Sequence, residues 1–342
     1  MARCLRNLQG TIGNRMIENT PIKKIPLPDY SFYKAKFEEN PDFHLPLKPI
    51  PFHRNGNLSK IPFPLNTSKK GWPWDFQSDL ALFPYLELPK FSVVIPSYQQ
   101  GKYLEEAIRS VLLQNYANIE LIIIDGGSTD STSEVLEHYR NQISFIVSEK
   151  DSGQSQAINK GFSIASGDLY YWLNSDDFLN KNSFNNIVPI FLKNEKIDIV
   201  YGHGLNLDAL TAKLTLDFAP IVFDRYLRFG GIILSHSVIW RSKIHCKIWE
   251  DLECAMDAEL WMRLFNDRKI KHCYYPIGVF RKHPEQKTAV NSGWDDKWIS
   301  DFEDHIWQHY SPIKKLNWRL RELEYKIVQK IHRFLIERKS IK

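Results

Sequence analysis

The sequence predicts an α/β protein built on a largely parallel sheet, and two features of the chain support this prediction. Between residues 91 and 174, short β-branched apolar runs alternate with segments whose apolar residues recur at helical spacing. Such alternation is typical of strand-helix-strand units, whose right-handed crossovers place consecutive strands side by side in parallel. The 342 residues are also 43% hydrophobic and 13% aromatic, which is ample material for a buried core.

Each expected element is recognised by its apolar spacing and by the residues that end it; Pro96, for example, ends the first strand. The expected strands are FSVVIP at 91–96, ELIIID at 120–125, ISFIVSE at 143–149, LYYWLN at 169–174 and IDIVYGH at 197–203. The expected helices are YLEEAIRSVLLQ at 103–114, TSEVLEHYRN at 132–141, SQAINKGFSIA at 155–165, residues 182–193 and CAMDAELWMRLFND at 254–267.

Polar side chains follow each of the first four expected strands. They are Ser97, Asp125, the pair Glu149 and Asp151, and the pair Asp176 and Asp177. Ligands bind at the carboxyl ends of parallel strands, so these side chains indicate a site along one edge of the sheet. Strands also end in polar residues for ordinary reasons, and the pattern alone leaves that alternative open.

The paired carboxylates in LNSDDFL are the most informative of these strand ends. Ionised carboxylates in an apolar setting cost several kcal/mol, so Asp176 and Asp177 require a cation, hydrogen-bond donors or water. Magnesium and manganese prefer oxygen ligands of this kind. Two surface aspartates in a turn are the alternative.

Composition divides the chain into three regions. Residues 1–88 are proline-rich, as in PIKKIPLPDY and KIPFPLN, and are expected to form an extended arm. Aromatics such as Trp72 and Trp74 argue against full disorder of this segment. From its composition, an arm wrapped on the main domain is favoured over a separate binding module. Residues 89–310 form the main domain, with halves at 89–177 and 178–310, and residues 311–342 form a basic tail.

Charge and cysteine content exclude some functions. The formal net charge is +5, but residues 312–342 hold ten basic and three acidic side chains, so the rest of the chain sums to 5 − 7 = −2. A nearly neutral body gives no support to nucleic-acid binding. Cys4, Cys246, Cys254 and Cys273 show no spacing typical of a zinc site. No apolar run is long enough for a signal core or a membrane span, and we expect a cytoplasmic protein, soluble or peripheral at the inner membrane face.

The basic tail is expected to form an amphipathic helix. Its apolar residues recur at spacings of 4, 3, 4, 4 and 3, at Leu316, Leu320, Leu323, Ile327, Ile331 and Phe334. Such a helix can bind anionic lipid through its cationic side chains. It can equally pack on the domain or pair with another copy, and the sequence leaves both possibilities open.

Several motifs, taken in order, resemble those of the family 2 glycosyltransferases. The resemblance starts with FSVVIPSYQQGKYLEEAIRSVLLQNYANIELIIIDGGSTD and continues through SEKDSGQSQAINKGFSIASGDLYYWLNSDD, MDAELWMRL and FRKHPEQKT. It covers roughly residues 90–288, about 200 of the 342 residues. The resemblance implies the GT-A fold, a Rossmann-like α/β domain that uses a nucleotide-sugar donor.

The resemblance also implies which residues hold the donor. They are Pro96, Ser97, Tyr98, Asp125, Gly127, Asp151, Gly153, Asn159, Lys160, Asp176 and Lys287. Asp125 is expected to accept from the imide of uracil, and the glycines let the backbone approach the base. The alternatives are that DGGSTD is a turn capped by Ser128 or Asp130, and that Asn159 lies on an ordinary helix face.

For the metal, the resemblance implies Mn²⁺ or Mg²⁺ bridging the donor's phosphates. Asp177 is expected as a direct ligand, Asp176 as a ligand of the ribose or a second metal contact, and His283 as a further ligand. Lys287 is expected to pair with the diphosphate. A structural role for His283 remains the alternative.

For the acceptor side, the resemblance implies Asp257 as the catalytic base, with Glu259 as the less favoured choice. Asp257 lies near the start of a helix, where the helix dipole favours an ionised carboxylate. His236 and Ser237 are expected to face the acceptor, with simple packing as the alternative.

Together these features predict an inverting, metal-dependent transfer of a sugar from a UDP-sugar to a hydroxyl group. The acceptor would be a glycan, lipid-linked or protein hydroxyl in polysaccharide or glycoconjugate biosynthesis. The chain has no QxxRW motif of the processive synthases, which favours single addition. The alternative is a catalytically silent protein that binds a nucleotide sugar or organises partners.

Overall fold

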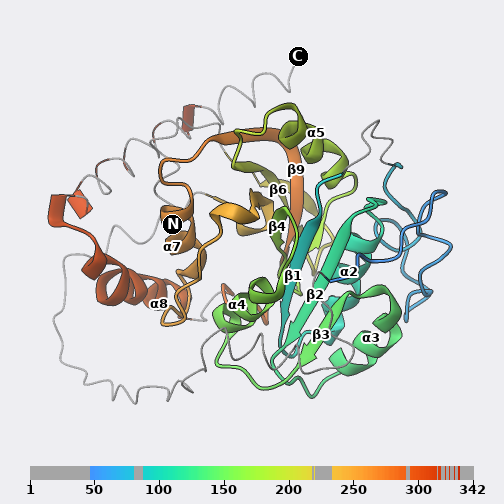
Figure 1. Ribbon diagram of the computed structural model, residues 1–342. Helices are drawn as coiled ribbons and strands as arrows, with labels where there is room; N and C mark the ends of the chain where they lie inside the picture. The colour runs from blue at the N-terminus through green and yellow to red at the C-terminus, as the bar shows by residue number, and fades with distance from the viewer. Residues whose placement is uncertain are drawn as a thin grey trace.

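The computed structural model describes residues 47–80, 88–217, 219, 233–289 and 293–313, together with 315–316, 320, 323, 327 and 330–331. Within these ranges the chain forms a nine-stranded sheet with helices on both faces (Figure 1). The fold is therefore α/β, as the sequence predicts.

The elements follow one another along the chain as the apolar spacing indicates, with most predicted ends shifted by a few residues. The strands are β1 (Phe91–Ser97), β2 (Ile119–Asp125), β3 (Phe145–Ser148), β4 (Leu169–Trp172), β5 (Phe178–Leu179), β6 (Ile199–Asp208), β7 (Leu214–Asp217), β8 (Val238–Arg241) and β9 (Ile270–Lys282). The α-helices are α2 (Gly101–Leu112), α3 (Thr132–His138), α4 (Gln154–Ile164), α5 (Ser183–Lys193), α7 (Met256–Leu264) and α8 (Trp294–Ser300). Single-turn segments include η2 (Ser235–Ser237) and the π-helical η4 (Asp301–His305). The sequence predicts no element where β7, β8, β9 and α8 lie.

The strand order is β3-β2-β1-β4-β8-β6-β9-β5, with β7 paired to β6 outside this path. The four strands from β3 to β4 are parallel, whereas β8 joins them antiparallel. In the register of the parallel part, Ser97 is the partner of Asp125, and Asp125 is the partner of Ser148. The ends of β1, β2 and β3 therefore meet along one edge, as the sequence predicts.

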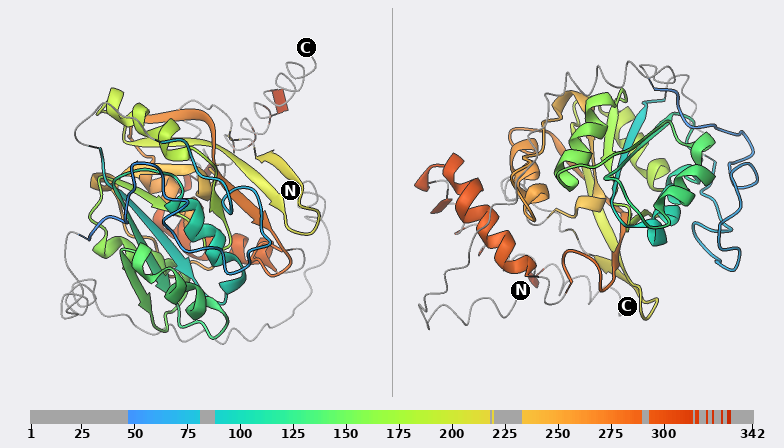
Figure 2. Two further views of the ribbon diagram at one scale, coloured as in Figure 1. Left: turned by 90° about the vertical axis from the view of Figure 1, so that its right-hand side faces the viewer. Right: turned by 90° about the horizontal axis from the view of Figure 1, so that it is seen from below.

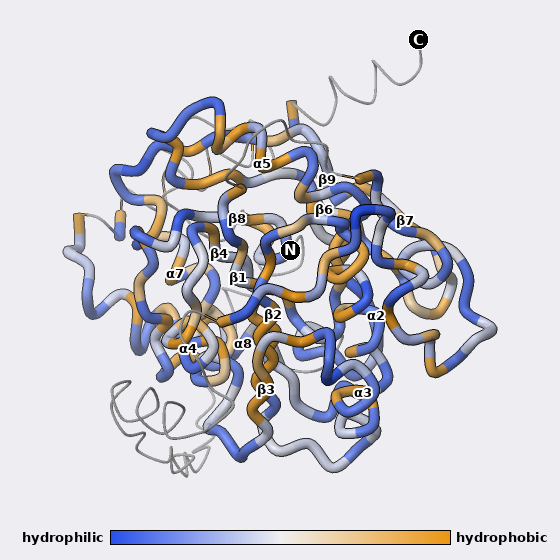
Figure 3. Tube along the Cα trace, turned by 45° about the vertical axis from the view of Figure 1, so that its right-hand side comes forward, coloured by the Kyte–Doolittle hydropathy of each residue, from blue (hydrophilic) through white to orange (hydrophobic). Residues whose placement is uncertain are grey.

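Alternate residues of the parallel strands enter two separate hydrophobic cores. In β1, Val94 packs in the core with α4 and α7, while Val93 and Ile95 pack in the core with α2, α3 and α5. This alternation is the period of two expected of a strand, and a sheet covered on both faces requires apolar residues at every position. Figure 3 shows the resulting hydrophobic strands β2 and β3 beside more hydrophilic helix surfaces.

Residues 47–80 contain no helix or strand and lie along the outer side of α2 (Figure 2). The buried side chain of Arg109 in α2 donates hydrogen bonds to the carbonyl oxygens of Pro62, Pro73 and Trp74 at 2.8–3.1 Å. The main-chain N–H of Leu65 donates to Oε1 of Glu105 at 2.7 Å. These polar bonds attach the proline-rich segment to α2. Prolines lack an N–H group and interrupt regular secondary structure, so the carbonyls of this segment need partners from elsewhere.

From residue 312 on, the described positions of the basic tail are helical, and Phe334 lies outside the described residues. Ile313, Leu316, Leu320, Leu323, Ile327 and Ile331 are each more than half exposed. The apolar stripe therefore does not pack on the part of the domain that the structure describes. In that same part of the chain, no helix combines the length and the apolar character needed to cross a bilayer.

Candidate functional site

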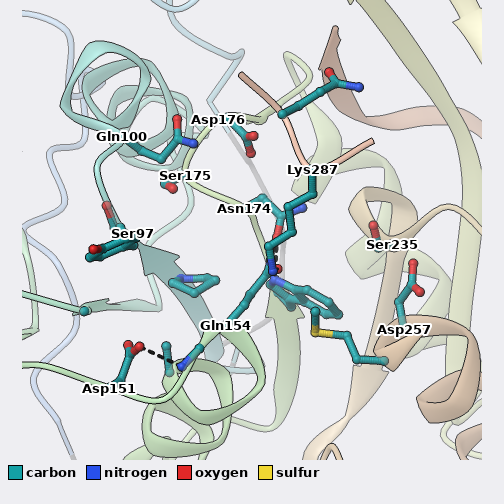
Figure 4. A pocket seen from close by; sticks show the side chains of 18 of the residues that line it. Ser97, Gln100, Asp151, Gln154, Asn174, Ser175, Asp176, Ser235, Asp257 and Lys287 are labelled. Carbon is teal, nitrogen blue, oxygen red and sulfur yellow. Dashed lines mark hydrogen bonds between the residues drawn. The ribbon is translucent and has the colours of Figure 1, made fainter. Parts of the chain in front are cut away.

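A cavity of about 650 Å³ lies at the carboxyl edge of the parallel strands and against the start of α7 (Figure 4). This size is typical of small-molecule sites. The predicted site residues that line it are Pro96, Ser97, Tyr98, Gly127, Asp151, Gly153, Asp176, Asp257 and Lys287. Those that do not line it are Asp125, Asn159, Lys160, Asp177, His236, Ser237 and His283. The cavity thus gathers side chains that are up to about 190 positions apart in the chain.

The end of β1 forms one side of the cavity. Ser97 is 4% exposed, and its Oγ has no hydrogen-bond partner among the described residues. Tyr98, the next residue, is 61% exposed. A buried hydroxyl without a partner costs free energy, so Ser97 is suited to bond a ligand in this cavity.

The glycine pair after β2 continues this side. Gly127 has φ +80°, and a Cβ built on it would lie 3.2 Å from the main-chain N of Lys150. Both the left-handed backbone and the close approach favour glycine at this position. The result is a wall of exposed main chain, against which a flat ring can lie.

Asp125 organises this turn from beneath it. Its carboxylate accepts from the N–H and the hydroxyl of Ser128 and from the hydroxyl of Ser148. With 1% of its surface exposed, Asp125 does not reach the cavity. The sequence identifies the right turn, but the residue shapes the turn rather than lining the wall.

Asp151 reaches the cavity from the loop after β3. Its Oδ1 accepts from the N–H of Gly153 at 2.9 Å, and burial raises the pKa of this carboxyl group. Gly153 has φ +128°, which again favours glycine. The first residue of α4, Gln154, lines the cavity beside them and bonds Asn174 at 2.8 Å.

Asn159 and Lys160 are buried on α4 away from the cavity. Asn159 bonds the main chain of Ile248 in both directions, at 2.8 and 2.9 Å. Lys160 is 1% exposed and forms an ion pair with Glu149 at 3.2 Å. These contacts hold α4 against the segment near Ile248 and against Glu149, and neither side chain lines the cavity.

The two adjacent aspartates face different environments. Asp176 lines the cavity with its side chain 22% exposed, and Asp177 is 1% exposed beneath the turn. The carboxylate of Asp177 accepts from the N–H of Arg281 at 2.9 Å and from Nδ2 of Asn174 at 3.2 Å. Burial, and then the charge of Asp176, raise the pKa of Asp177 well above its usual range. The cavity-facing carboxylate is therefore Asp176, and the metal and ribose roles expected of the two aspartates stay predictions.

His283 supports Asp176 from the loop after β9. Its Nε2 lies 3.1 Å from Oδ2 of Asp176, and its ring packs on Tyr103 with centroids 4.6 Å apart. The same loop brings Lys287 to the cavity, where Nζ donates to Oε1 of Gln154 at 3.1 Å. This loop therefore carries a cation over the wall that holds Asp176.

The Asp176 carboxylate and the His283 imidazole are ligand types that manganese or magnesium can take, but two side chains do not complete the coordination of either ion. Among the residues that the structure describes, no group of three or more His, Cys, Asp or Glu side chains is arranged to hold a metal ion. The protein would contribute the Asp176 oxygens and His283, and further oxygen ligands would have to come from a bound molecule such as a diphosphate. The residues present fit a metal that arrives with its ligand.

Asp257 forms the opposite wall of the cavity, near Ser235 (Figure 4). It lies in the first turn of α7, and its Oδ1 accepts from the N–H of Ala258 at 2.7 Å. Burial raises the pKa of Asp257 to about 6. A carboxyl group with this pKa ionises just below neutral pH, which suits a general base. Glu259, the other choice from the sequence, is fully buried and paired with Arg263, away from the cavity.

The start of α7 is held by a residue that sequence reasoning missed. Asp301, which is 4% exposed in η4, accepts from the N–H groups of Glu253, Cys254 and Ala255 at 2.6–3.1 Å. These N–H groups immediately precede the helix and would otherwise be unpaired. Asp301 therefore fixes the segment from which Asp257 projects. It lies 44 residues beyond Asp257, so no local pattern signals this contact.

His236 and Ser237 lie behind the cavity wall. His236 stacks on Phe280 with centroids 5.8 Å apart, and burial lowers its pKa to about 4, so the ring is neutral at neutral pH. The hydroxyl of Ser237 donates to the carbonyl of His203 at 3.0 Å. Phe280 and Ser235 line the cavity instead. The acceptor-facing roles expected of His236 and Ser237 stay predictions, and the adjacent Ser235 is the residue of this segment that lines the cavity.

Further lining residues come from the loops that the sequence identified only in part. They are Gln100, Gly126, Lys150, Gln154, Ala157, Trp172, Asn174, Ser175, Ser235, Glu253, Cys254, Met256, Phe280, Glu285, Gln286 and Thr288. Half of them, eight of sixteen, are direct neighbours of predicted residues, so for these the signal was position at a strand end or loop rather than residue type. The cavity therefore offers three kinds of surface. The main chain of the glycine turn can contact a flat ring, Asp176 and Lys287 can contact charged groups of a ligand, and the carboxylate of Asp257 lies on the opposite side.

Comparison with known proteins relates these features to a family. The model of the family described as "Glycosyl transferase family 2" matches residues 92–229. An uncharacterised glycosyltransferase of Nostoc sp. is 31% identical over 223 residues, which are 59% of this chain and 69% of the relative. Another, of Rickettsia prowazekii, is 28% identical over 262 residues, 72% of this chain and 78% of the relative.

Solved structures with a similar fold include S. aureus TarS 1–349 in complex with UDP-GlcNAc. The TM-score is 0.50 with 20% sequence identity, over 59% of this chain and 61% of that chain. A likeness at this identity concerns the fold, and it confirms the GT-A architecture expected from the sequence.

Proposed function

Because the chain belongs to glycosyltransferase family 2 and is thus a glycosyltransferase, we propose that it transfers a sugar from a UDP-sugar to a hydroxyl acceptor with inversion. The observation that carries this proposal is the position of Asp257 across one cavity from Ser97, Asp151 and Asp176. A donor held against the strand ends would then present its sugar toward α7.

The nucleoside would lie against the glycine turn, with its ring on the main chain of Gly126 and Gly127. The unpartnered hydroxyl of Ser97 and the carboxyl group of Asp151 line the cavity beside that surface, and a Cβ built on Gly126 would lie 2.9 Å from Oδ2 of Asp151. In this arrangement Asp125 supports the turn through Ser128 and Ser148, while the groups on the wall contact the base and ribose. UDP is the nucleotide that we propose for this pocket.

The middle of the cavity would hold the diphosphate. Asp176 and His283 would bind a divalent cation, manganese or magnesium, which neutralises part of the charge that develops on the departing UDP. Lys287, which bonds Gln154 across the cavity mouth, would contact the same phosphates. Asp177 keeps the turn in place from below through its bonds to Arg281 and Asn174.

The reaction at the anomeric carbon would then use Asp257. The acceptor hydroxyl oxygen forms a bond to the anomeric carbon from the face opposite the phosphate, and its proton passes to the Asp257 carboxylate. The bond from that carbon to the phosphate oxygen breaks, and its electron pair leaves with UDP. Attack opposite the leaving group inverts the configuration. Single addition is proposed because the sequence has no QxxRW motif.

A donor screen tests this function. The protein with MnCl₂ is heated with UDP-sugars and GDP-sugars, and a ligand at about 100 times its Kd should add about 2.7 kcal/mol of stability. We expect a UDP-sugar to raise the melting temperature and, with an acceptor panel of glycans, lipid-linked glycans and hydroxyl peptides, to release UDP. Stabilisation by GDP-sugars alone would contradict the choice of UDP. Binding of a donor without any turnover across the panel would favour the silent binding protein.

The apolar stripe of the tail helix is a second surface that is suited to bind another molecule, because its side chains are exposed. The stripe residues lie on one helical face and are 53–73% exposed, while the tail sequence carries a net charge of +7. A second copy would bring another +7 helix alongside, so like charges oppose self-association. We propose that the stripe binds the surface of an anionic bilayer, to which each Lys or Arg adds about 1 kcal/mol.

Flotation with vesicles tests the lipid proposal. The full chain and an L320E/L323E variant are mixed with phosphatidylcholine vesicles, with and without phosphatidylglycerol, and L210E is the control because Leu210 is 81% exposed elsewhere. We expect the full chain and L210E to float only with phosphatidylglycerol, and L320E/L323E to stay in solution. The lipid proposal would be contradicted if the full chain does not float and instead sediments as a dimer that the L320E/L323E substitutions dissociate. The stripe would then serve self-association.

A further inference from the structure

Arg281, near the end of β9 and just before the His283 loop, contacts both residues of the aspartate turn. Its main-chain N–H donates to Oδ1 of Asp177 at 2.9 Å, and its side-chain Nε donates to the carbonyl oxygen of Asp176 at 2.9 Å. The side chain is 8% exposed and does not line the cavity. One residue therefore holds the side chain of one aspartate and the main chain of the other.

The other end of the guanidinium is anchored on α2. Nη2 donates to Oε2 of Glu106 at 2.7 Å, and Glu106 is 12% exposed in its side chain. The guanidinium also lies over the rings of Tyr103 and Phe178, at 5.1 and 5.3 Å from their centroids. A planar fork with separate donors can bridge a carbonyl and a carboxylate in this way, whereas a lysine offers a single charged nitrogen.

The anchor on α2 is itself fixed. Two nearby residues of α2, Glu105 and Arg109, bond the main chain of the segment 62–74. Tyr103, one turn earlier, packs on both Arg281 and His283. The aspartate turn is therefore tied through Arg281 to a helix whose position is set by contacts far from the cavity.

We propose that Arg281, held by Glu106, is a positioning residue that keeps Asp176 directed into the cavity for a metal-bound diphosphate. This inference rests on the proposed function, because it concerns how Asp176 meets the donor. Without the guanidinium, the carbonyl of Asp176 loses its donor and the turn loses its tie to α2. The side-chain contacts of Asn174 and His283 and the main-chain N–H of Arg281 remain, but none of them bonds that carbonyl. Since binding then requires the turn to be ordered first, the affinity for the diphosphate falls.

The experiment compares R281Q, R281K and E106Q with R241Q as a matched control. Arg241 likewise donates to two carbonyls, those of Ile197 and Phe191, and lies over the Phe191 ring at 5.1 Å, but it has no contact with the aspartates. The probe is UDP with MnCl₂, and the readouts are its Kd by titration calorimetry and the melting temperature of each protein. We expect R281Q and E106Q to weaken binding about tenfold and R281K about threefold, with R241Q unchanged even where its melting temperature falls equally.

A double variant, E106Q/R281Q, separates positioning from general damage. If the two side chains act as one unit, the double variant should bind the probe about as weakly as R281Q alone. Unchanged binding by R281Q, or an equal loss in R241Q, would overturn the positioning role. Failure of the unsubstituted protein to bind UDP with manganese would instead overturn the proposed function, so the two failures are distinguishable.

Discussion

The two walls of the cavity differ in how their side chains are held. The wall formed by residues 96–176 comes from successive parallel strands, and the strand register aligns Ser97, Asp125 and Ser148. The opposite wall, with Ser235 and Asp257, comes from a single helical turn and from the start of α7. There, position depends on long-range bonds such as those of Asp301.

This difference implies a division of work within the site. The strand-end wall is rigid because two cores cover its sheet, and it can hold a donor by many small contacts. The helical wall carries one carboxylate whose chemistry depends on its placement and its pKa. Variants of the first wall should therefore change donor binding, and variants of the second should change turnover.

The largest effect is expected for D257N. An amide cannot take the acceptor proton, so kcat should fall by about 10²–10⁴-fold, the range typical of general base catalysis. Donor Kd, measured by calorimetry with MnCl₂, should change less than about twofold, because Asp257 lies on the other wall. E259Q is the control, since Glu259 is buried with Arg263. Full activity of D257N would show that Asp257 is not the catalytic base, and it would contradict the proposal that the two walls serve donor binding and turnover separately.

A smaller effect is expected for D301N. Asparagine keeps one acceptor but loses the charge and one oxygen, so the N–H groups of residues 253–255 are held less firmly. We expect kcat to fall about 20-fold, within the roughly 100-fold that a 1 Å displacement can cost, while donor KM stays near its original value. D304N on the same turn, where Asp304 is exposed, is the control. A rise in donor KM with unchanged kcat would show that the two walls are not independent.

The pH dependence of kcat/KM should report Asp257. Because burial raises its pKa to about 6, the carboxylate is ionised above that pH and protonated below it. The base form is therefore lost as pH falls, and the rate at pH 5 should be about one tenth of that at pH 8. The measurement is the initial rate at saturating MnCl₂ between pH 5 and 8. The residual activity of D257N should lack the inflection near 6, and an identical inflection in that variant would assign it to another group.

The smallest effect is expected for S97A on the strand-end wall. Removing a hydroxyl that bonds a donor costs about 0.5–1.5 kcal/mol, which corresponds to a loss of about 2- to 12-fold in donor affinity. Donor KM should rise by this factor with kcat unchanged. The matched control is S163A, whose hydroxyl donates to the carbonyl of Lys160 on the helix away from the cavity. A fall in kcat without a change in KM would place Ser97 near the reacting atoms instead.

The strand-end wall could be predicted from the chain because its signals are local. A β-branched run that ends in a polar residue predicts a strand and the position of its carboxyl end. Parallel packing then places the carboxyl ends of neighbouring strands along one edge of the sheet. Ser97, Asp151 and Asp176 were identified in this way and do line the cavity. Local pattern could not tell which of two adjacent aspartates faces the ligand, because a two-residue turn can present either side chain.

The helical wall was predicted less completely for a physical reason. Asp257 was identified through the motif MDAELWMRL that resembles the family and through its place at a helix start, but Asp301 and Arg281 act through bonds to residues 46 or more positions away in the chain. A hydrogen bond to a distant main-chain group leaves no periodicity or composition in the sequence. Which residue of the segment 235–237 lines the cavity, Ser235, also depends on tertiary packing, because its neighbours His236 and Ser237 are buried.

The amino-acid sequence by itself determined the α/β class, the order of the main strands and helices, and the acidic character of the strand ends, because apolar periodicity and strand-end polarity are properties of neighbouring residues. Only the tertiary structure decided that Asp176 rather than Asp177 meets the cavity, that Asp257 faces it from the other side, and that Arg281 joins the aspartate turn to α2. Those outcomes depend on which distant donors are left to pair once the two cores have packed.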